Sequence, residues 1–309
     1  MKKEEFYFDS RDNHSKIHAV KWIPENKPVC IVQIVHGMAE YVERYEEFAK
    51  FLVQKDILVT GEDHLGHGKS IGDNPPGYFC KRDAATVVVR DVHRLKKMIQ
   101  EEYPGIPYFI FGHSMGSIVS RNYIARYGTG IDGVILSGTG NPDPKMLHAA
   151  AVMSAVLKCF QGAKHPSKLL DRIGFGHNND RIEKPCAEHA WLSTNEENVK
   201  AYDADPLCGF LFTINGLETV KTLSLRMYDE GMLANIPRKL PVLFIYGAGD
   251  PVGEYGKGVK QAYESYHEMG MQDVSIKEYK NDRHELLNED DKEEVMNDVL
   301  KWLMEHMEP

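Results

Sequence analysis

The sequence predicts an α/β fold in which a mostly parallel central sheet carries helices on both faces. Seven short apolar runs, rich in β-branched residues, recur along the chain, and segments with helical periodicity lie between most of them. The runs are apolar on consecutive residues, which is typical of strands that are buried on both faces. At 309 residues the chain is long enough to bury a large core.

The predicted strands occupy residues 17–23, 29–35, 57–61, 108–111, 133–136, 242–246 and 274–279. Helices are expected where apolar side chains recur every three or four positions, because that spacing places them on one face. Three segments show this spacing most clearly, at residues 45–52, 88–99 and 295–303.

One interval interrupts the alternation of strands and helices. Residues 141–238 contain no strand-like run, and so long a segment in a compact domain cannot be a loop. We therefore predict a helical cap (lid) subdomain at 141–238, inserted into a core made of 1–140 and 239–309. Its apolar segment 146–157 favours a helix buried under the insert; the alternative is a lid helix that presents an apolar face to a lipid-like substrate.

Composition and charge argue against a nucleic-acid-binding, membrane-spanning or disulfide-rich protein. The net charge is −9 and no segment concentrates lysine and arginine, so a nucleic-acid partner is not expected. No secretory signal is visible and no apolar run reaches the ~20 residues that a membrane span requires. The five cysteines are scattered without C-x-x-C spacing, which predicts no disulfide framework, no zinc site and a cytoplasmic protein.

A Gly-x-Ser-x-Gly motif at Gly112–Gly116 directly follows the predicted strand 108–111 and precedes the helix-compatible residues 117–123. A strand, this motif and a helix in succession are typical of a nucleophile elbow, where a strained turn exposes the serine hydroxyl. The glycines are expected because a Cβ at either position would crowd the neighbouring strand and helix. The alternative is a tight glycine turn with a solvated Ser114, since a motif this short also arises by chance.

A serine nucleophile needs an imidazole to take its proton and a carboxylate to orient that imidazole. Asp250 follows the strand 242–246 in a turn rich in glycine and proline, and we predict that it is the acid. Asp143, which follows the strand 133–136, is the alternative acid.

His284 is the predicted base. It follows the strand 274–279 in a loop-like segment, and the resulting chain order of serine, acid and histidine is that of α/β-hydrolases. The two other histidines after Asp250, His267 and His306, lie in helical segments and are expected on solvated faces.

A tetrahedral oxyanion needs two preorganised N–H donors. We expect the amide of Met115, directly after the serine, to be the first, and the amide of Met38, after the early strand 29–35, to be the second. Gly37 would permit the close backbone approach, and His36 is expected to tie loops together rather than to act as a second base.

Two other patterns are decoys. Gly66–Ser70 ends like a phosphate-binding loop, but Asp63 stands where the first glycine would be required. His64 and His67 with Asp63 suggest a metal site, yet they fit better as hydrogen-bonding turn residues. We therefore predict no metal and no organic cofactor.

Together these stretches resemble the monoglyceride lipase and lysophospholipase-like branch of the α/β-hydrolases, also described as serine aminopeptidase-like or hydrolase 4. The resemblance is carried by His36–Glu40 with Arg44 and Tyr45, Asp63–Ser70, Gly112–Gly116, Gly247–Asp250 and His284–Glu289. It implies an α/β-hydrolase fold, a cap over the active site and hydrolysis of carboxylic esters of lipids. It also implies Ser114, Asp250 and His284 as the triad, with Met38 and Met115 as the oxyanion donors.

The expected function is therefore a serine hydrolase that cleaves small-molecule esters, foremost monoacyl lipids such as monoacylglycerols or lysophospholipids, through an acyl-enzyme on Ser114. The apolar segment 146–157 and aromatics such as Phe210 and Phe212 favour an acyl substrate and a transient contact of the cap with a lipid interface. An amidase, an aminopeptidase or an acyltransferase with the same triad is the alternative. An aminopeptidase would need acidic cap residues to bind an amino group, and the candidates are Glu183, Glu188, Glu196 and Glu197. A non-catalytic binding module is a further alternative, although such proteins typically lose a triad member.

Overall fold

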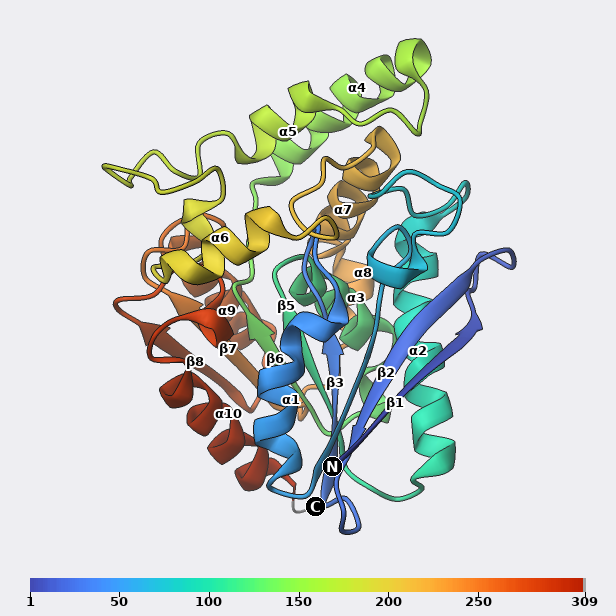
Figure 1. The fold of residues 1–309 in the computed structure, drawn as a ribbon, viewed down its shortest axis with the longest axis vertical. Helices are drawn as coiled ribbons and strands as arrows, with labels where there is room; N and C mark the ends of the chain where they lie inside the picture. The colour runs from blue at the N-terminus through green and yellow to red at the C-terminus, as the bar shows by residue number, and fades with distance from the viewer. Residues whose placement is uncertain (308–309) are drawn as a thin grey trace.

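The computed structural model describes residues 1–307 and is built around one eight-stranded sheet (Figure 1). The strands are β1 (Lys2–Asp9), β2 (Lys16–Ile23), β3 (Cys30–Val35), β4 (Ile57–Glu62), β5 (Tyr108–His113), β6 (Gly133–Ser137), β7 (Val242–Gly247) and β8 (Val274–Tyr279). Their spatial order is β1-β2-β4-β3-β5-β6-β7-β8, in which β2 is antiparallel to both of its neighbours and all other pairs are parallel. The predicted α/β class with a mostly parallel sheet is confirmed.

Helices cover both faces of the sheet. On one face lie α2 (Ala84–Glu102), α3 (Met115–Tyr127) and α9 (Lys257–Glu268), and on the other α1 (Glu46–Val53) and α10 (Lys292–His306). Alternate residues of a strand therefore enter different core layers, as Phe244 and Ile245 of β7 do. Short 3-10 turns complete the core at η1 (Val42–Tyr45), η2 (Gly68–Ser70), η3 (Gly128–Gly130) and η5 (Leu286–Asn288).

The edge strand β1 was not among the predicted strands. This edge strand pairs with β2 along its whole length but reads Lys-Lys-Glu-Glu-Phe-Tyr-Phe-Asp, and most of its side chains are at least partly exposed. An edge strand needs no apolar run, and charged residues on it protect the free edge from pairing with another chain.

Five helices lie between β6 and β7, with no named strand among them. They are α4 (Pro144–Gln161), α5 (Lys168–Phe175), α6 (Glu196–Ala204), α7 (Ile214–Arg226) and α8 (Glu230–Ala234), with η4 (Ala190–Leu192) before α6. In Figure 1, α4 and α5 lie at the top, farthest from the sheet. The last two residues of the predicted core segment 239–309 lie outside the described residues.

The prediction that segment 146–157 is a buried helix is wrong. The segment belongs to α4, in which Ser154 is the one buried residue. Four large apolar side chains of α4 are more than half exposed, namely Met146, Val152, Val156 and Phe160. An apolar composition all round the helix suggested burial, but α4 packs on α7 along one side and leaves the opposite side uncovered.

Within residues 1–307, no helix is long and apolar enough to cross a membrane.

The packing of α10 on the sheet predicts a large loss of stability when its anchor is truncated. Trp302 is 6% exposed and packs edge-to-face against Phe109 of β5, with ring centroids 6.0 Å apart. Trp302→Ala is expected to lower the free energy of unfolding by about 3–5 kcal/mol, because it removes buried area and leaves a cavity. Urea denaturation measures this. Met304→Ala on the same helix is the control, since Met304 is 60% exposed and its loss is expected to change stability by about 0.5 kcal/mol or less.

Candidate active site

Ser114 lies on a strained turn between β5 and α3. Its backbone has φ 53° and ψ −119°, a conformation that L-residues rarely adopt, and α3 begins at the next residue. The flanking glycines have no room for a side chain: a Cβ on Gly116 would lie 1.8 Å from the carbonyl oxygen of Val35, and one on Gly112 would lie 2.6 Å from the carbonyl oxygen of Gly116. The strand, turn and helix therefore have the expected arrangement and present the serine side chain at the N-terminus of a helix.

His284 and Asp250 form a buried pair. Asp250 follows β7, His284 follows β8, and His284 Nδ1 lies 2.9 Å from Asp250 Oδ2. The other carboxylate oxygen of Asp250 accepts a hydrogen bond from the Val252 amide at 2.8 Å, which fixes the carboxylate in its turn. Because both side chains are 2% exposed or less, the hydrogen bond is shielded from water.

The environment of His284 favours its charged form. Burial lowers the pKa of His284, but the charge and hydrogen bond of Asp250, with the charges of Glu285 and Glu40, outweigh it and raise the pKa above its ordinary value. His113 lies beside this ring, with centroids 4.7 Å apart, and burial lowers the pKa of His113 to about 3. His113 is therefore a neutral neighbour of His284.

The alternative acid Asp143 and the two other late histidines have partners elsewhere in the structure. Asp143 is the N-cap of α4, where its side chain accepts a hydrogen bond from the Lys145 amide at 2.7 Å. His306 of α10 contacts the Trp302 carbonyl and the carboxylate of Asp273, which directly precedes β8, and His267 belongs to α9.

The amides of Met38 and Met115 are available as donors. Both residues line the same cavity as Ser114 and His284. Among the loop, turn and cap hydrogen bonds of residues 1–307, none is donated by the amide of Met38 or Met115 to a backbone carbonyl. The loop that carries Met38 passes close to the serine, because a Cβ on Gly37 would lie 3.2 Å from the Ser114 Cβ.

The cavity beside Ser114 has a volume of about 320 Å³, within the range of small-molecule sites. The segment between β6 and β7 supplies much of its wall, including side chains that sequence reasoning had not singled out: Asp171, Phe175, Asn179, Trp191, Tyr202 and Val220. Phe210 lines the cavity as expected, whereas Phe212 is fully buried beside Phe79 and His67. No local motif marks these wall residues, because they are brought together by the packing of distant helices.

The turn after β4 is held by hydrogen bonds to Asp63. Its buried carboxylate accepts from the amides of Val42 and Lys69, at 2.9 and 2.8 Å, and pairs with His18 Nδ1 at 2.8 Å. His67 bonds the Leu65 carbonyl at 3.0 Å, so this residue and Asp63 are hydrogen-bonding turn residues, as predicted. His64 differs, because neither of its ring nitrogens has a hydrogen-bond partner, although Nδ1 lies 3.8 Å from Glu62 Oε1.

His36 ties two loops together. Its Nε2 accepts a hydrogen bond from the His64 amide at 2.9 Å, and its Nδ1 donates to the Gly37 carbonyl at 2.8 Å. The ring therefore joins the turn after β4 to the loop that carries Met38, which is the structural role expected of it.

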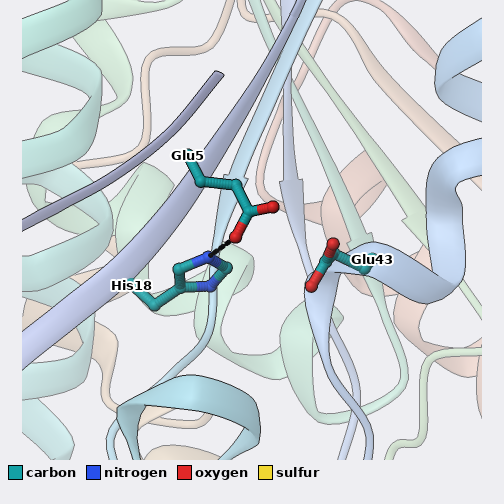
Figure 2. Close-up of side chains that lie close together, drawn as sticks. All are labelled: Glu5, His18 and Glu43. Atoms are coloured by element: carbon teal, nitrogen blue, oxygen red, sulfur yellow. Dashed lines mark hydrogen bonds and ion pairs between the residues drawn. The ribbon is translucent and has the colours of Figure 1, made fainter. Parts of the chain in front are cut away.

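A different group has the residue types of a metal site. Figure 2 shows Glu5, His18 and Glu43, whose potential ligand atoms lie within 4.8 Å of one another. Lys69 Nζ lies 2.6 Å from Glu5 and 2.9 Å from Glu43, so a lysine already occupies the place of a cation. Burial lowers the pKa of His18, but hydrogen bonds and charge from Asp63 and Glu5 raise it overall. Both nitrogens of His18 already have carboxylate partners, Asp63 and Glu5, so this cluster is a hydrogen-bonded salt-bridge network that joins β1 to the core.

Known proteins with the same architecture share sequence with this chain. A family model described as serine aminopeptidase, S33, matches residues 26–291. A monoglyceride lipase of Mus musculus is 31% identical over 281 residues, which cover 90% of this chain and 82% of that protein. A monoacylglycerol lipase of Mycolicibacterium smegmatis is 26% identical over 294 residues, covering 93% of this chain and 92% of that protein.

Among solved structures, a thermostable carboxyl esterase from Bacillus coagulans in complex with glycerol superimposes with a TM-score of 0.90 at 30% identity, covering 99% of both chains. The expected α/β-hydrolase fold is thereby confirmed.

The tight contact at Gly116 predicts that alanine lowers stability there but not at a glycine with open space around it. Gly116→Ala is expected to lower the free energy of unfolding by about 3 kcal/mol or more, because the new Cβ overlaps the backbone of β3. Gly174→Ala in α5 is the matched control: nothing lies within 4 Å of its Cβ position, and alanine there is expected to raise stability by about 0.5–1 kcal/mol. Denaturant unfolding measures both, and equal effects of the two substitutions would contradict the close packing of the turn.

Proposed function

Because this chain belongs to the serine aminopeptidase S33 family, we propose that it is a serine hydrolase that cleaves the carboxylic ester of monoacyl lipids. Ser114 is the nucleophile, His284 the general base and acid, and Asp250 the carboxylate that orients His284. The amides of Met38 and Met115 bind the oxyanion. The observation that carries this proposal is the strained Ser114 in one cavity with His284, which is hydrogen-bonded to the buried Asp250.

The reaction proceeds through two tetrahedral intermediates. Ser114 Oγ attacks the ester carbonyl while His284 Nε2 takes its proton, and the negative charge on the former carbonyl oxygen is held by the two amides. The imidazolium then protonates the departing alkoxide, which leaves as an alcohol and leaves an acyl-enzyme on Ser114. Water, deprotonated by the same His284, attacks the acyl carbon and forms the second tetrahedral intermediate. Its collapse breaks the bond between the acyl carbon and Ser114 Oγ, the imidazolium returns the proton to Oγ, and the carboxylic acid leaves. The Asp250 carboxylate stabilises the imidazolium in both steps.

Two observations favour a monoacyl lipid as the substrate. Apolar side chains from the segment between β6 and β7, among them Phe175, Phe210 and Val220, line the cavity beside Ser114. The relatives that align with most of the chain are named monoglyceride and monoacylglycerol lipases. We further propose that residues 141–238 act as the cap of this cavity over a core of residues 1–140 and 239–309.

The aminopeptidase alternative rests on one feature. Of the four acidic residues considered for binding an amino group, Glu188 lines the cavity, and Asp171 from α5 lines it as well. Cleavage of an aminoacyl p-nitroanilide at a rate comparable to ester cleavage would favour that alternative.

Initial rates over an ester series test the proposal directly. Acyl groups from acetyl to palmitoyl, with monoacylglycerol and lysophosphatidylcholine included, are expected to be cleaved faster as the chain lengthens. Ser114→Ala is expected to lower kcat/KM by about 10⁴-fold or more, since it removes the nucleophile. Ser265→Ala on α9 is the matched control and should retain activity, because the Ser265 hydroxyl donates to the Ala262 carbonyl of its own helix and Ser265 does not line the cavity. Equal rates for wild type and Ser114→Ala would refute the proposal, and activity confined to short esters would refute the lipid preference.

The exposed side of α4 and α5 fits a lipid surface. Met146, Val152, Val156 and Phe160 share one face of α4 at helical spacing, and Leu169 and Ile173 of α5 are each about half exposed. Exposed apolar surface of this kind marks interaction sites. We propose that this face rests transiently on the lipid interface from which the substrate enters.

Vesicle co-sedimentation tests this contact. Phe160→Glu is expected to weaken partitioning onto phosphatidylcholine vesicles by about tenfold, because it replaces about 1.5 kcal/mol or more of apolar burial with a charge. Met304→Glu on α10, also an exposed apolar residue far from this face, should partition as wild type does. Absence of vesicle binding by the wild-type protein, or equal loss in both variants, would contradict the proposed surface.

A further inference from the structure

A buried ionic cluster lies next to the proposed catalytic residues. It consists of Glu40, Arg44 and Glu285, and is called the Arg44 cluster below. The guanidinium of Arg44 donates to both carboxylate oxygens of Glu285, at 2.6 and 2.8 Å, and to Glu40 Oε2 at 2.9 Å. The side chain of Arg44 is 11% exposed and those of the two glutamates are 4% exposed.

One arm of the cluster reaches the loop of Met38. Glu40 Oε1 accepts hydrogen bonds from the Gly37 amide at 2.5 Å and from the Tyr45 hydroxyl at 2.8 Å. The carboxylate thus closes a four-residue turn around Met38, whose amide is a proposed oxyanion donor. Ala39 within this turn has φ 52°, so the turn depends on such contacts to keep its shape.

The other arm reaches the base. Glu285 directly follows His284, and besides Arg44 its carboxylate accepts from Asn198 of α6 at 2.8 Å and from Asn288 at 3.0 Å. Its backbone amide donates to the Leu192 carbonyl at 2.7 Å. The residue after His284 is therefore held from both the core and the inserted helices.

Stability alone does not explain such a cluster. Burying one cation with two carboxylates costs desolvation that the ion pairs barely recover, and an apolar replacement is often as stable. What the Arg44 cluster does is to join two loops from distant parts of the chain, since Arg44 and Glu285 are 241 positions apart.

We propose that Arg44 is a positioning residue, which holds the oxyanion loop of Met38 and the loop of His284 in register and balances the negative charge beside His284. This inference rests on the proposed function of Ser114, Asp250 and His284. A misplacement of about 1 Å in either loop would cost on the order of 100-fold in rate.

The charges around His284 give a signature that a purely structural residue would lack. Asp250 faces the ring from the loop after β7, neutral His113 from β5, and Glu285 and Glu40 from the Arg44 cluster. The two glutamates raise the pKa of His284, and Arg44 holds the pKa of Glu285 below its ordinary value. His284 must be neutral to act as base, so the acid limb of kcat/KM follows its pKa. Removing the cation should move this limb to higher pH, and neutralising Glu285 should move it to lower pH.

Three variants test the proposal with p-nitrophenyl butyrate as the substrate. Arg44→Met is expected to lower kcat by about 100-fold with little change in KM, and to move the acid limb upward. Arg44→Lys keeps the charge but cannot form the two-pronged pair, so kcat should fall while the acid limb stays in place. Glu285→Gln should move the acid limb downward.

Lys21→Met is the control, because Lys21 is 8% exposed and pairs with Glu102 and Glu4 far from the cavity. This substitution removes a buried cation and its two ion pairs, and it should leave kcat and the pH profile unchanged. Melting temperatures of all variants separate folding from catalysis, and if Arg44→Met does not fold, Arg44→Lys and Glu285→Gln still test geometry and charge.

Wild-type kcat in Arg44→Lys and Arg44→Met, or acid limbs that move in the same direction in Arg44→Met and Glu285→Gln, would overturn the proposal. Neither result would contradict the proposed function, because that function is tested separately, by the loss of hydrolysis in Ser114→Ala. Hydrolysis that does not depend on Ser114 would instead refute the proposed function.

Discussion

The close approach of α3 to the sheet is the constraint on which the rest of the site depends. Gly116 lies so near the Val35 carbonyl that no side chain fits, and this contact fixes where α3 begins. With the helix start fixed, the turn at Ser114 has to take a strained conformation, and the serine side chain points away from the sheet toward the cavity. The free energy that keeps this strain comes from the buried strands and α3, both of which belong to the hydrophobic core.

The parallel order of the strands explains why distant residues meet. The carboxyl ends of β3, β5, β7 and β8 lie at one edge of the sheet, and the loops after them carry Met38, Ser114, Asp250 and His284. The segment between β6 and β7 adds the wall of the cavity at the same edge. Loops that leave a rigid sheet at one edge can hold several polar groups in fixed positions while the core remains apolar.

Charge is distributed unevenly around this edge. The histidines near the serine differ in state: burial keeps His113 neutral, whereas the charge of Asp250 favours protonated His284. Arg44 balances Glu40 and Glu285 behind these histidines. Beside the edge strand β1, Lys69 pairs with Glu5 and Glu43, and His18 hydrogen-bonds to Glu5 (Figure 2). The two buried carboxylates, Glu40 and Glu285, thus have a cation and N–H donors, as burial requires.

The sequence by itself determined the strands of the core and the order of the candidate triad. Apolar runs mark strands such as β3 and β7 because both faces are buried, and Gly112–Gly116 marks the turn because only glycine fits there. Local patterns carry no such mark for features that depend on distant neighbours. The edge strand β1 has no apolar run, and α4 is apolar all round yet exposed because one neighbouring helix covers one side of it. Only the tertiary structure decided which side chains of the segment between β6 and β7 line the cavity and that Arg44 joins two loops, since both result from packing between segments far apart in the chain.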